Sequence, residues 1–151
     1  GENSYSLHAE LQEITHNLVG IIRTGSELKE AIEKIAEIRK RSANVSVAGG
    51  RKFNPGFHLA FDLDNMLLVA ESTAKSAISR EESRGGHTRD DFPQLDNKWR
   101  QINHISSFNG KEVSVRKQDL PALPKELFDL FDVHELEKYM TPEEITKGGA
   151  R

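Results

Sequence analysis

The chain has 151 residues, 36% of them hydrophobic and 30% charged, with a formal net charge of -3. This balance lacks the basic excess with which proteins bind nucleic-acid phosphates, and no apolar run reaches the roughly 18 residues that direct membrane insertion needs. The absence of cysteine excludes disulfides, thiolate metal ligands and iron–sulfur ligation. Because the chain begins at Gly1 rather than methionine, we expect it to be excised from a longer protein.

The N-terminal part predicts two amphipathic helices. Over residues 6–23 the apolar side chains recur every three or four positions, the spacing of one face of a helix. Thr24 followed by Glu27 matches a capping box, and a second apolar stripe runs from there to the basic residues at 39–41. Residues 42–56, rich in glycine, asparagine and proline, then predict a loop. The first stripe consists of Leu7, Leu11, Ile14, Leu18 and Ile21, and the second of Leu28, Ile32, Ile35 and Ile38.

A third, longer helix is predicted over residues 57–81, about 37 Å at 1.5 Å per residue. Three amphipathic helices joined by short connections pack most simply as an antiparallel bundle. We therefore predict a mainly α fold, an antiparallel three-helix bundle of the spectrin-repeat kind over residues 1–98. The expected core stripe of the third helix is Leu59, Leu63, Met66, Leu67, Ala70, Ala74, Ala77 and Ile78.

Residues 99–118 predict a β-hairpin packed on the bundle. Asn109-Gly110 reads as its two-residue turn, and pairing across it places Ile102, Phe108, Val113 and Val115 on one face. Residues 119–151 predict an irregular tail with short helices, the last of them starting at Thr141. We expect these parts to form one domain.

No motif for catalysis, cofactor binding or metal binding is found. The six histidines lack the spacing that aims two rings at one metal, and the paired glycines do not form G-x-G-x-x-G after a strand. No G-x-S-x-G nucleophile elbow occurs. We expect no catalytic, cofactor-binding or metal-binding residue in this chain.

One segment, residues 82–93, supports a functional interpretation and is called the signature loop below. Arg84 and Arg89 can make forked bonds to carboxylates or carbonyls, while Gly85 and Gly86 let another surface come close. These features favour a docking element whose charged groups find their best partners outside the chain. The alternative, a solvated helix end with internal ion pairs, carries equal weight.

The signature loop reads E-S-R-G-G-H-T-R-D-D-F-P and resembles the E-S-R-G-x-H-x-R-x-D-x-P motif of fumarate reductase and succinate dehydrogenase flavoproteins. L-Q-E-I-T-H-N-L-V-G-I-I-R-T at residues 11–24 resembles the first helix of their C-terminal domain. N-P-G-F-H-L at residues 54–59 and the L-F-D-L-F-D and E-L-E-K-Y-M segments of the tail are most similar to actinobacterial-type succinate dehydrogenases. L-aspartate oxidase and adenylylsulfate reductase share this domain and remain alternatives, as does an autonomous helical interaction module.

The resemblance implies a structural and docking role within a parent subunit that interconverts succinate and fumarate. FAD is then expected in the parent subunit and not in this chain. The implied partners are the flavin-binding and capping domains of the same subunit, an iron–sulfur subunit and a membrane anchor, in a cytoplasmic complex on the inner face of the plasma membrane. The expected interdomain docking residues are Glu82, Arg84, Gly85, Gly86, His87, Arg89, Asp91 and Trp99.

Overall fold

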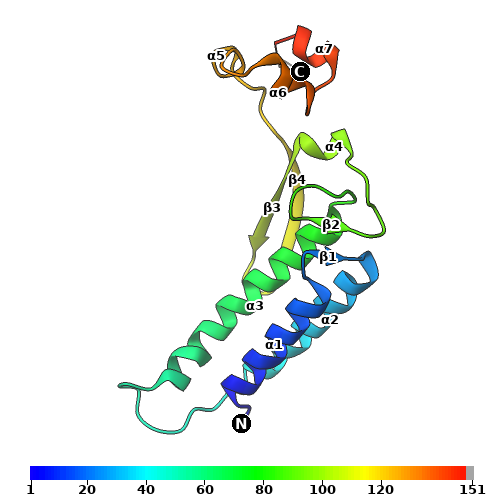
Figure 1. Cartoon of the computed structure of the whole chain (residues 1–151). Helices are drawn as coiled ribbons and strands as arrows, with labels where there is room; N and C mark the ends of the chain where they lie inside the picture. Colours follow the sequence, from blue (N-terminus) through cyan, green and yellow to red (C-terminus); the bar gives the residue numbers. More distant parts are fainter. Residues whose placement is uncertain (149–151) are drawn as a thin grey trace. The chain divides into compact units, whose positions relative to one another are not determined.

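The computed structural model describes residues 1–148 in two compact units (Figure 1). The first unit holds residues 1–96 and 104–116, and the second holds residues 97–103 and the chain from 117 onward. The sequence had placed its boundaries after residues 98 and 118. The structure instead assigns the middle of the hairpin to the bundle and the hairpin ends to the tail. The last three residues of the predicted tail lie outside the described range.

The first unit contains three long helices: α1 (Ser4–Leu18), α2 (Gly25–Ser42) and α3 (Pro55–Ser79). Each begins with a side-chain cap, which satisfies amide groups that have no partner within the helix. Asn3 caps α1, and Asn54 caps α3 with Pro55 in its first turn. The predicted capping box of Thr24 and Glu27 is present at the start of α2. The helices run up, down and up, which confirms the antiparallel three-helix bundle (Figure 1).

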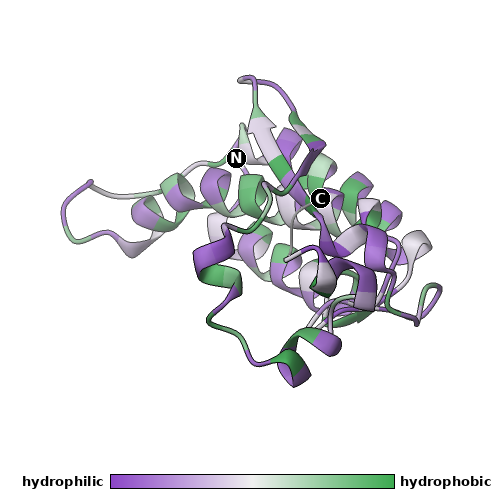
Figure 2. Ribbon diagram, turned by 90° about the horizontal axis from the view of Figure 1, so that it is seen from above, coloured by the Kyte–Doolittle hydropathy of each residue, from purple (hydrophilic) through white to green (hydrophobic). Residues whose placement is uncertain are grey.

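The core lies along the line where the three helices meet. Leu63 and Leu67 of α3 are fully buried, as the apolar stripe predicts. Hydrophobic and hydrophilic residues are interspersed along the helices, as amphipathic packing requires (Figure 2). The buried cluster consists of Leu7, Leu11, Ile14, Ala31, Ile35, Ile38, Leu63, Leu67 and Ala74.

The first helix ends earlier than its apolar pattern predicted. It stops at Leu18, and residues 22–23 form the short strand β1 (Ile22–Arg23), which pairs in parallel with β2 (Thr88–Arg89). Ile21 and Ile22 are mostly exposed. The prediction that this helix continues to Arg23 is therefore wrong, because the backbone of residues 21–23 bonds to the signature loop instead of continuing the helix.

The predicted hairpin is present as β3 (Ile102–Phe108) and β4 (Val113–Asp119). Residues 109–112 connect the two strands, which is longer than the predicted two-residue turn. Within this connection the Asn109 side chain accepts bonds from the amides of Lys111 and Glu112. Within the first unit, Lys75 of α3 donates to the Val113 carbonyl at 2.6 Å. Val113 is buried, but Phe108 is half-exposed, so the predicted apolar face is only partly covered.

The second unit contains four short helices: α4 (Asn97–Arg100), α5 (Lys125–Phe128), α6 (Val133–Glu137) and α7 (Pro142–Thr146). A capping box of Thr141 and Glu144 starts α7, at the position that the sequence predicted. The Glu144 carboxylate also accepts bonds from Arg100 and Gln101, which tie α7 to α4.

Candidate functional site

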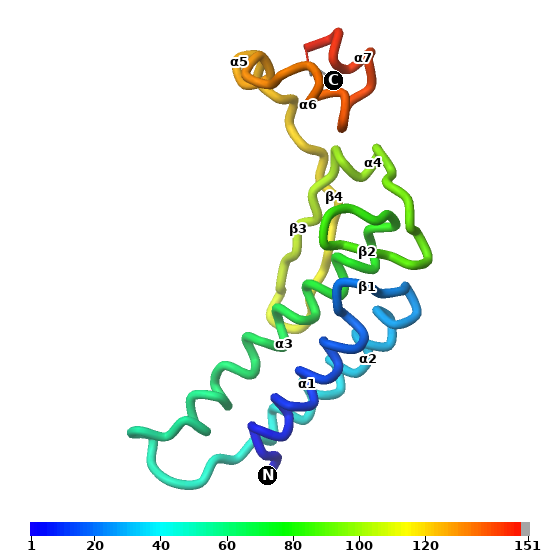
Figure 3. Tube along the Cα trace, viewed as in Figure 1, coloured from blue at the N-terminus to red at the C-terminus, as the bar shows by residue number. Residues whose placement is uncertain are grey.

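The signature loop leaves the C-terminal end of α3 and folds back on itself (Figure 3). Arg84 and His87 exchange two backbone hydrogen bonds, which close a tight turn over Gly85 and Gly86. Gly85 takes a φ of 58°, a conformation that side-chain-bearing residues rarely adopt, whereas no left-handed φ occurs at Gly86. A Cβ added at either glycine would meet nothing within 4 Å. The turn therefore presents bare backbone on an open surface.

Glu82 is fully buried, yet its carboxylate has several donors. Arg84 forks onto both of its oxygens at 2.9 and 3.0 Å, Arg80 donates to one, and the Asp96 amide donates to the other at 3.0 Å. Burial alone would raise the pKa of Glu82, but these bonds outweigh that effect and lower its pKa. The Glu82 carboxylate thus connects the start of the signature loop to the residues that follow its end.

Arg89 is 2% exposed and connects two helix ends. One of its guanidinium nitrogens donates to the carbonyls of Ala77, Ile78 and Arg80, at the C-terminal end of α3. The other two donate to the two oxygens of Asp91 at 2.7 and 2.8 Å.

Asp91 extends this connection to α2, because its carboxylate accepts the Gly25 amide at 2.9 Å. The cation therefore lies at the negative end of α3 and the carboxylate at the positive end of α2, an arrangement that both helix dipoles stabilise. The bond from Arg89 is the main cause that lowers the pKa of Asp91 to about 2.

Ser83 fixes the loop between these two ion pairs. Its hydroxyl accepts the Arg89 amide at 2.9 Å and donates to the Phe92 carbonyl at 2.9 Å. The Thr88 and Asp90 amides bond to the carbonyls of Ile21 and Arg23, which form the β1–β2 pairing. The loop is therefore attached along its length to the helical bundle.

These contacts show how the docking candidates are held in this chain. Glu82, Arg84, Arg89 and Asp91 have charged partners inside the first unit, so the internal ion pairs of the alternative interpretation are present. A docking role for these side chains stays a proposal. Trp99 is 2% exposed, and the Lys117 ammonium lies 4.2 Å from its ring centre. Gly85, Gly86 and part of His87 remain available for docking.

Metal and dinucleotide sites have characteristic geometries, against which the described residues can be compared. Among residues 1–148 no three His, Asp or Glu side chains gather into a group able to hold a metal ion, and no helix is long and apolar enough to cross a membrane. The glycine pair of the signature loop leads into strand β2 rather than into a helix N-terminus, the arrangement that holds a dinucleotide pyrophosphate. The signature loop is therefore not a dinucleotide cradle of this kind.

The helical bundle and the signature loop both fall within the part of the chain that matches a known family. The family described as fumarate reductase flavoprotein C-term matches residues 8–138. The chain belongs to this family. It is thus a C-terminal domain of the fumarate reductase and succinate dehydrogenase flavoproteins, and the resemblance stated from the signature loop is confirmed.

Relatives of this flavoprotein domain include flavoprotein subunits of two bacteria. The fumarate reductase flavoprotein subunit of Helicobacter pylori is 33% identical over 132 residues, which cover 85% of this chain and 18% of the relative. The succinate dehydrogenase flavoprotein subunit of Bacillus subtilis is 30% identical over 124 residues, covering 79% of this chain and 21% of the relative. The chain therefore spans about a fifth of the length of these curated relatives.

A solved structure extends the match to almost the whole domain. The Mycobacterium smegmatis Sdh1 complex in the apo form superimposes with a TM-score of 0.87 and 47% identity, covering 97% of this chain and 25% of that chain. This agrees with the similarity to actinobacterial-type proteins noted in the segment at residues 54–59 and in the tail.

Proposed function

We propose that the chain is the C-terminal helical domain of an FAD-dependent succinate dehydrogenase or fumarate reductase flavoprotein subunit, in which it serves as a structural and docking element. The observation that supports this proposal most directly is the similarity to the Mycobacterium smegmatis Sdh1 structure over 97% of this chain. Interconversion of succinate and fumarate then belongs to the parent subunit. FAD is proposed for the flavin-binding domain of that subunit.

The proposed partners are first the flavin-binding and capping domains of the same subunit, and then an iron–sulfur subunit and a membrane anchor on the cytoplasmic side of the plasma membrane. Large apolar side chains on the surface of the first unit support an interface with another protein surface, since exposed apolar patches commonly mark such contacts. Those at least 65% exposed are Ile21, Ile22, Phe53, Phe61 and Val69.

The Gly85–Gly86 turn is the proposed point of closest approach. Its backbone is held by the Arg84–His87 bonds and by the buried Glu82 cluster, so it is already ordered before another surface arrives. A preformed surface reduces the ordering entropy that association costs.

The test is Gly86→Leu in the full-length parent subunit. Because Gly86 has no left-handed φ and open space around it, the new side chain should leave the domain folded while keeping a neighbouring surface away. We expect a melting temperature of the isolated domain within about 2 °C of wild type, a surface-substitution effect, and loss of fumarate reduction or FAD retention in the full-length subunit.

Gly50→Leu is the matched control. Gly50 also has open space and no left-handed φ, and it lies in the loop between α2 and α3 rather than in the signature loop. Gly50→Leu should preserve folding, FAD content and turnover. Normal assembly and turnover of the Gly86→Leu subunit would refute docking at the turn, and a full-length subunit without succinate or fumarate activity would refute the assignment of the parent.

A further inference from the structure

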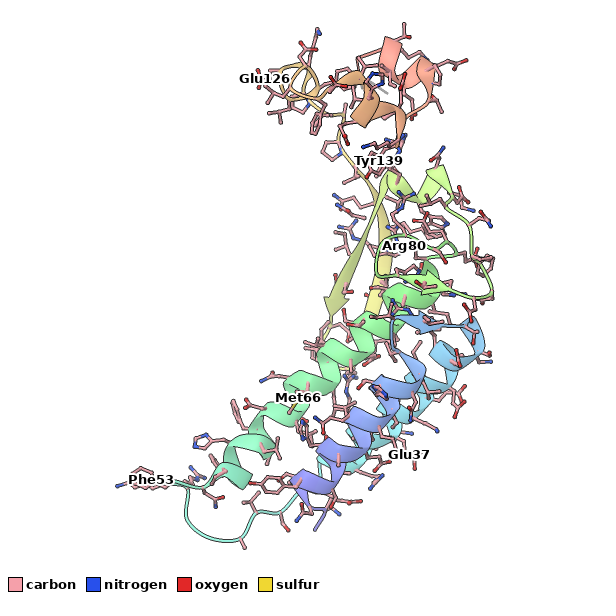
Figure 4. The ribbon with its side chains drawn as sticks, in the orientation of Figure 1. Glu37, Phe53, Met66, Arg80, Glu126 and Tyr139 are labelled. Carbon is pink, nitrogen blue, oxygen red and sulfur yellow. The ribbon has the colours of Figure 1, made fainter. Side chains whose placement is uncertain are left out.

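A second polar feature of the first unit is a cleft of about 390 Å³ beside the signature loop. It is formed by the C-terminal half of α3, by β1, by the loop and by the start of the hairpin. Figure 4 labels Arg80 at the end of α3, where the loop begins. The lining residues that carry the argument are Arg23, Ser76, Arg80, His87 and His104.

The lining contains cations, imidazoles and hydroxyls, and no carboxylate occurs among its described residues. The positive field in the cleft acts on the groups that line it. Burial, followed by the neighbouring charges of Arg23, Arg80 and Arg89, lowers the pKa of His87. Burial and then Arg89 also lower the pKa of Arg23. Such a field favours an anion.

Arg23 is the residue that distinguishes this cleft from an ordinary basic surface. It is 91% buried, since its exposed fraction is 9%. One terminal nitrogen donates to the Val19 carbonyl at 3.1 Å, while the buried Nε has no hydrogen-bond partner among the described residues. A buried donor without a partner costs free energy, and a buried charge needs a counter-charge.

The other arginines nearby do not share this property. Arg84 and Arg89 each form a forked pair with a carboxylate, and Arg80 donates to Glu82. Arg23 has no carboxylate within ion-pair distance in the described part of the chain. The β1–β2 pairing holds it opposite Arg89, so the two cations are kept together by backbone structure.

We propose that this cleft binds a carboxylate group, with Arg23 as the main ligand and the hydroxyl of Ser76 and the rings of His87 and His104 completing the site. Guanidinium groups bind carboxylates through short, charge-assisted bonds. The carboxylate has two sources, a free dicarboxylate or an acidic side chain of another protein segment. The proposal depends on the proposed function only in its choice of succinate as a probe.

The experiment titrates the ¹⁵N-labelled chain with sodium succinate, sodium acetate and sodium phosphate at constant ionic strength. We expect saturable shifts of the Arg23 side-chain Nε–H and of the Ser76 and His87 amides with carboxylates. Succinate that binds at least tenfold more tightly than acetate indicates a free dicarboxylate ligand. Equal affinities support a single carboxylate of the kind that a side chain supplies. Tighter binding of phosphate than of either, or no saturable shift, would overturn the proposal.

Arg23→Gln should weaken carboxylate binding at least about tenfold, because it removes the charge-assisted bond. Arg51 is an exposed arginine in the loop before α3, and Arg51→Gln should leave carboxylate binding unchanged.

A second pair of variants avoids dependence on the folding of Arg23→Gln. Ser76→Asp places a carboxylate in the cleft and should raise the melting temperature above that of the uncharged, equal-sized Ser76→Asn, and it should abolish the succinate shifts. A lower melting temperature for Ser76→Asp than for Ser76→Asn would contradict the proposal. These readouts use no redox activity, so they fail or succeed independently of the proposed function.

Discussion

Replacing Arg89 by alanine should destabilise the first unit strongly. The side chain makes five hydrogen bonds, three to carbonyls at the end of α3 and two to Asp91, from an almost fully buried position. Removing one partner of a buried ion pair typically costs about 3–5 kcal/mol. Asp91 is 36% exposed and keeps its bond from Gly25, so it regains water and the loss should be near the lower limit, about 3 kcal/mol.

For a chain of this size, about 3 kcal/mol corresponds to a fall in melting temperature of roughly 6–12 °C. Thermal unfolding followed by circular dichroism at the helical band measures it, with urea unfolding as a second measure of the free energy. Arg116→Ala is the control, because this exposed arginine should cost less than about 0.5 kcal/mol. If Arg89→Ala and Arg116→Ala have the same melting temperature, the helix-bridging role assigned to Arg89 is wrong.

Two further effects follow from the same structure. Leu67→Ala should cost about 2–5 kcal/mol in urea unfolding because Leu67 is fully buried, whereas Val69→Ala, at 65% exposed, should cost under about 0.5 kcal/mol; equal losses would mean that the stripe is not core. The pKa of Asp91 is lowered from 3.8 to about 2, so its contribution to stability is complete above pH about 4 and is lost as the pH falls through about 2. Asp91→Asn should flatten this part of the stability profile, and an unchanged profile would show that other carboxylates produce it.

The helices could be predicted because their signals are local. Apolar spacing identified all three, and the Thr24–Glu27 box fixed the start of α2. Asn54 and Pro55 were assigned to the preceding loop, whereas they are the N-cap and the first residue of α3. The end of α1 was missed because the apolar stripe continued through Ile21. Gly20 was the available signal, since a Cβ there would lie 2.9 Å from the His16 carbonyl, as at many helix ends where only glycine fits.

The β1–β2 pairing could not be predicted in this way. It joins Ile22 and Arg23 to Thr88 and Arg89, far apart in the sequence, and each strand has only two residues. No alternation pattern can be recognised over so short a length. The pairing follows from tertiary structure, because the signature loop packs back on the bundle and supplies the amide donors.

The partners of the charged residues in the signature loop could not be predicted from the sequence either. From the sequence, Arg84 and Arg89 suited an external carboxylate as well as an internal one, because the chemistry of the fork is the same in both cases. Glu82 and Asp91 each lie two residues from their arginine, but only the fold orients the pairs and buries Glu82. The motif identified the family correctly, while its composition gave no information on which partner each charge takes.

The internal ion pairs give the docking proposal a more specific form. Arg89 and Asp91 fix the end of α3 against the start of α2, and the Glu82 cluster closes the loop, so these side chains determine where the Gly85–Gly86 turn lies. The same contacts hold Arg23 beside the cleft through β1. A variant of Arg89 or Glu82 should therefore impair docking and stability together, whereas Gly86→Leu and Arg23→Gln act on the exposed turn and on the cleft without removing an ion pair of the loop. Assembly and stability should therefore be measured together for both classes of variant. A variant that loses both identifies a residue that holds the surface in place, and a variant that loses assembly alone identifies a residue that contacts the partner.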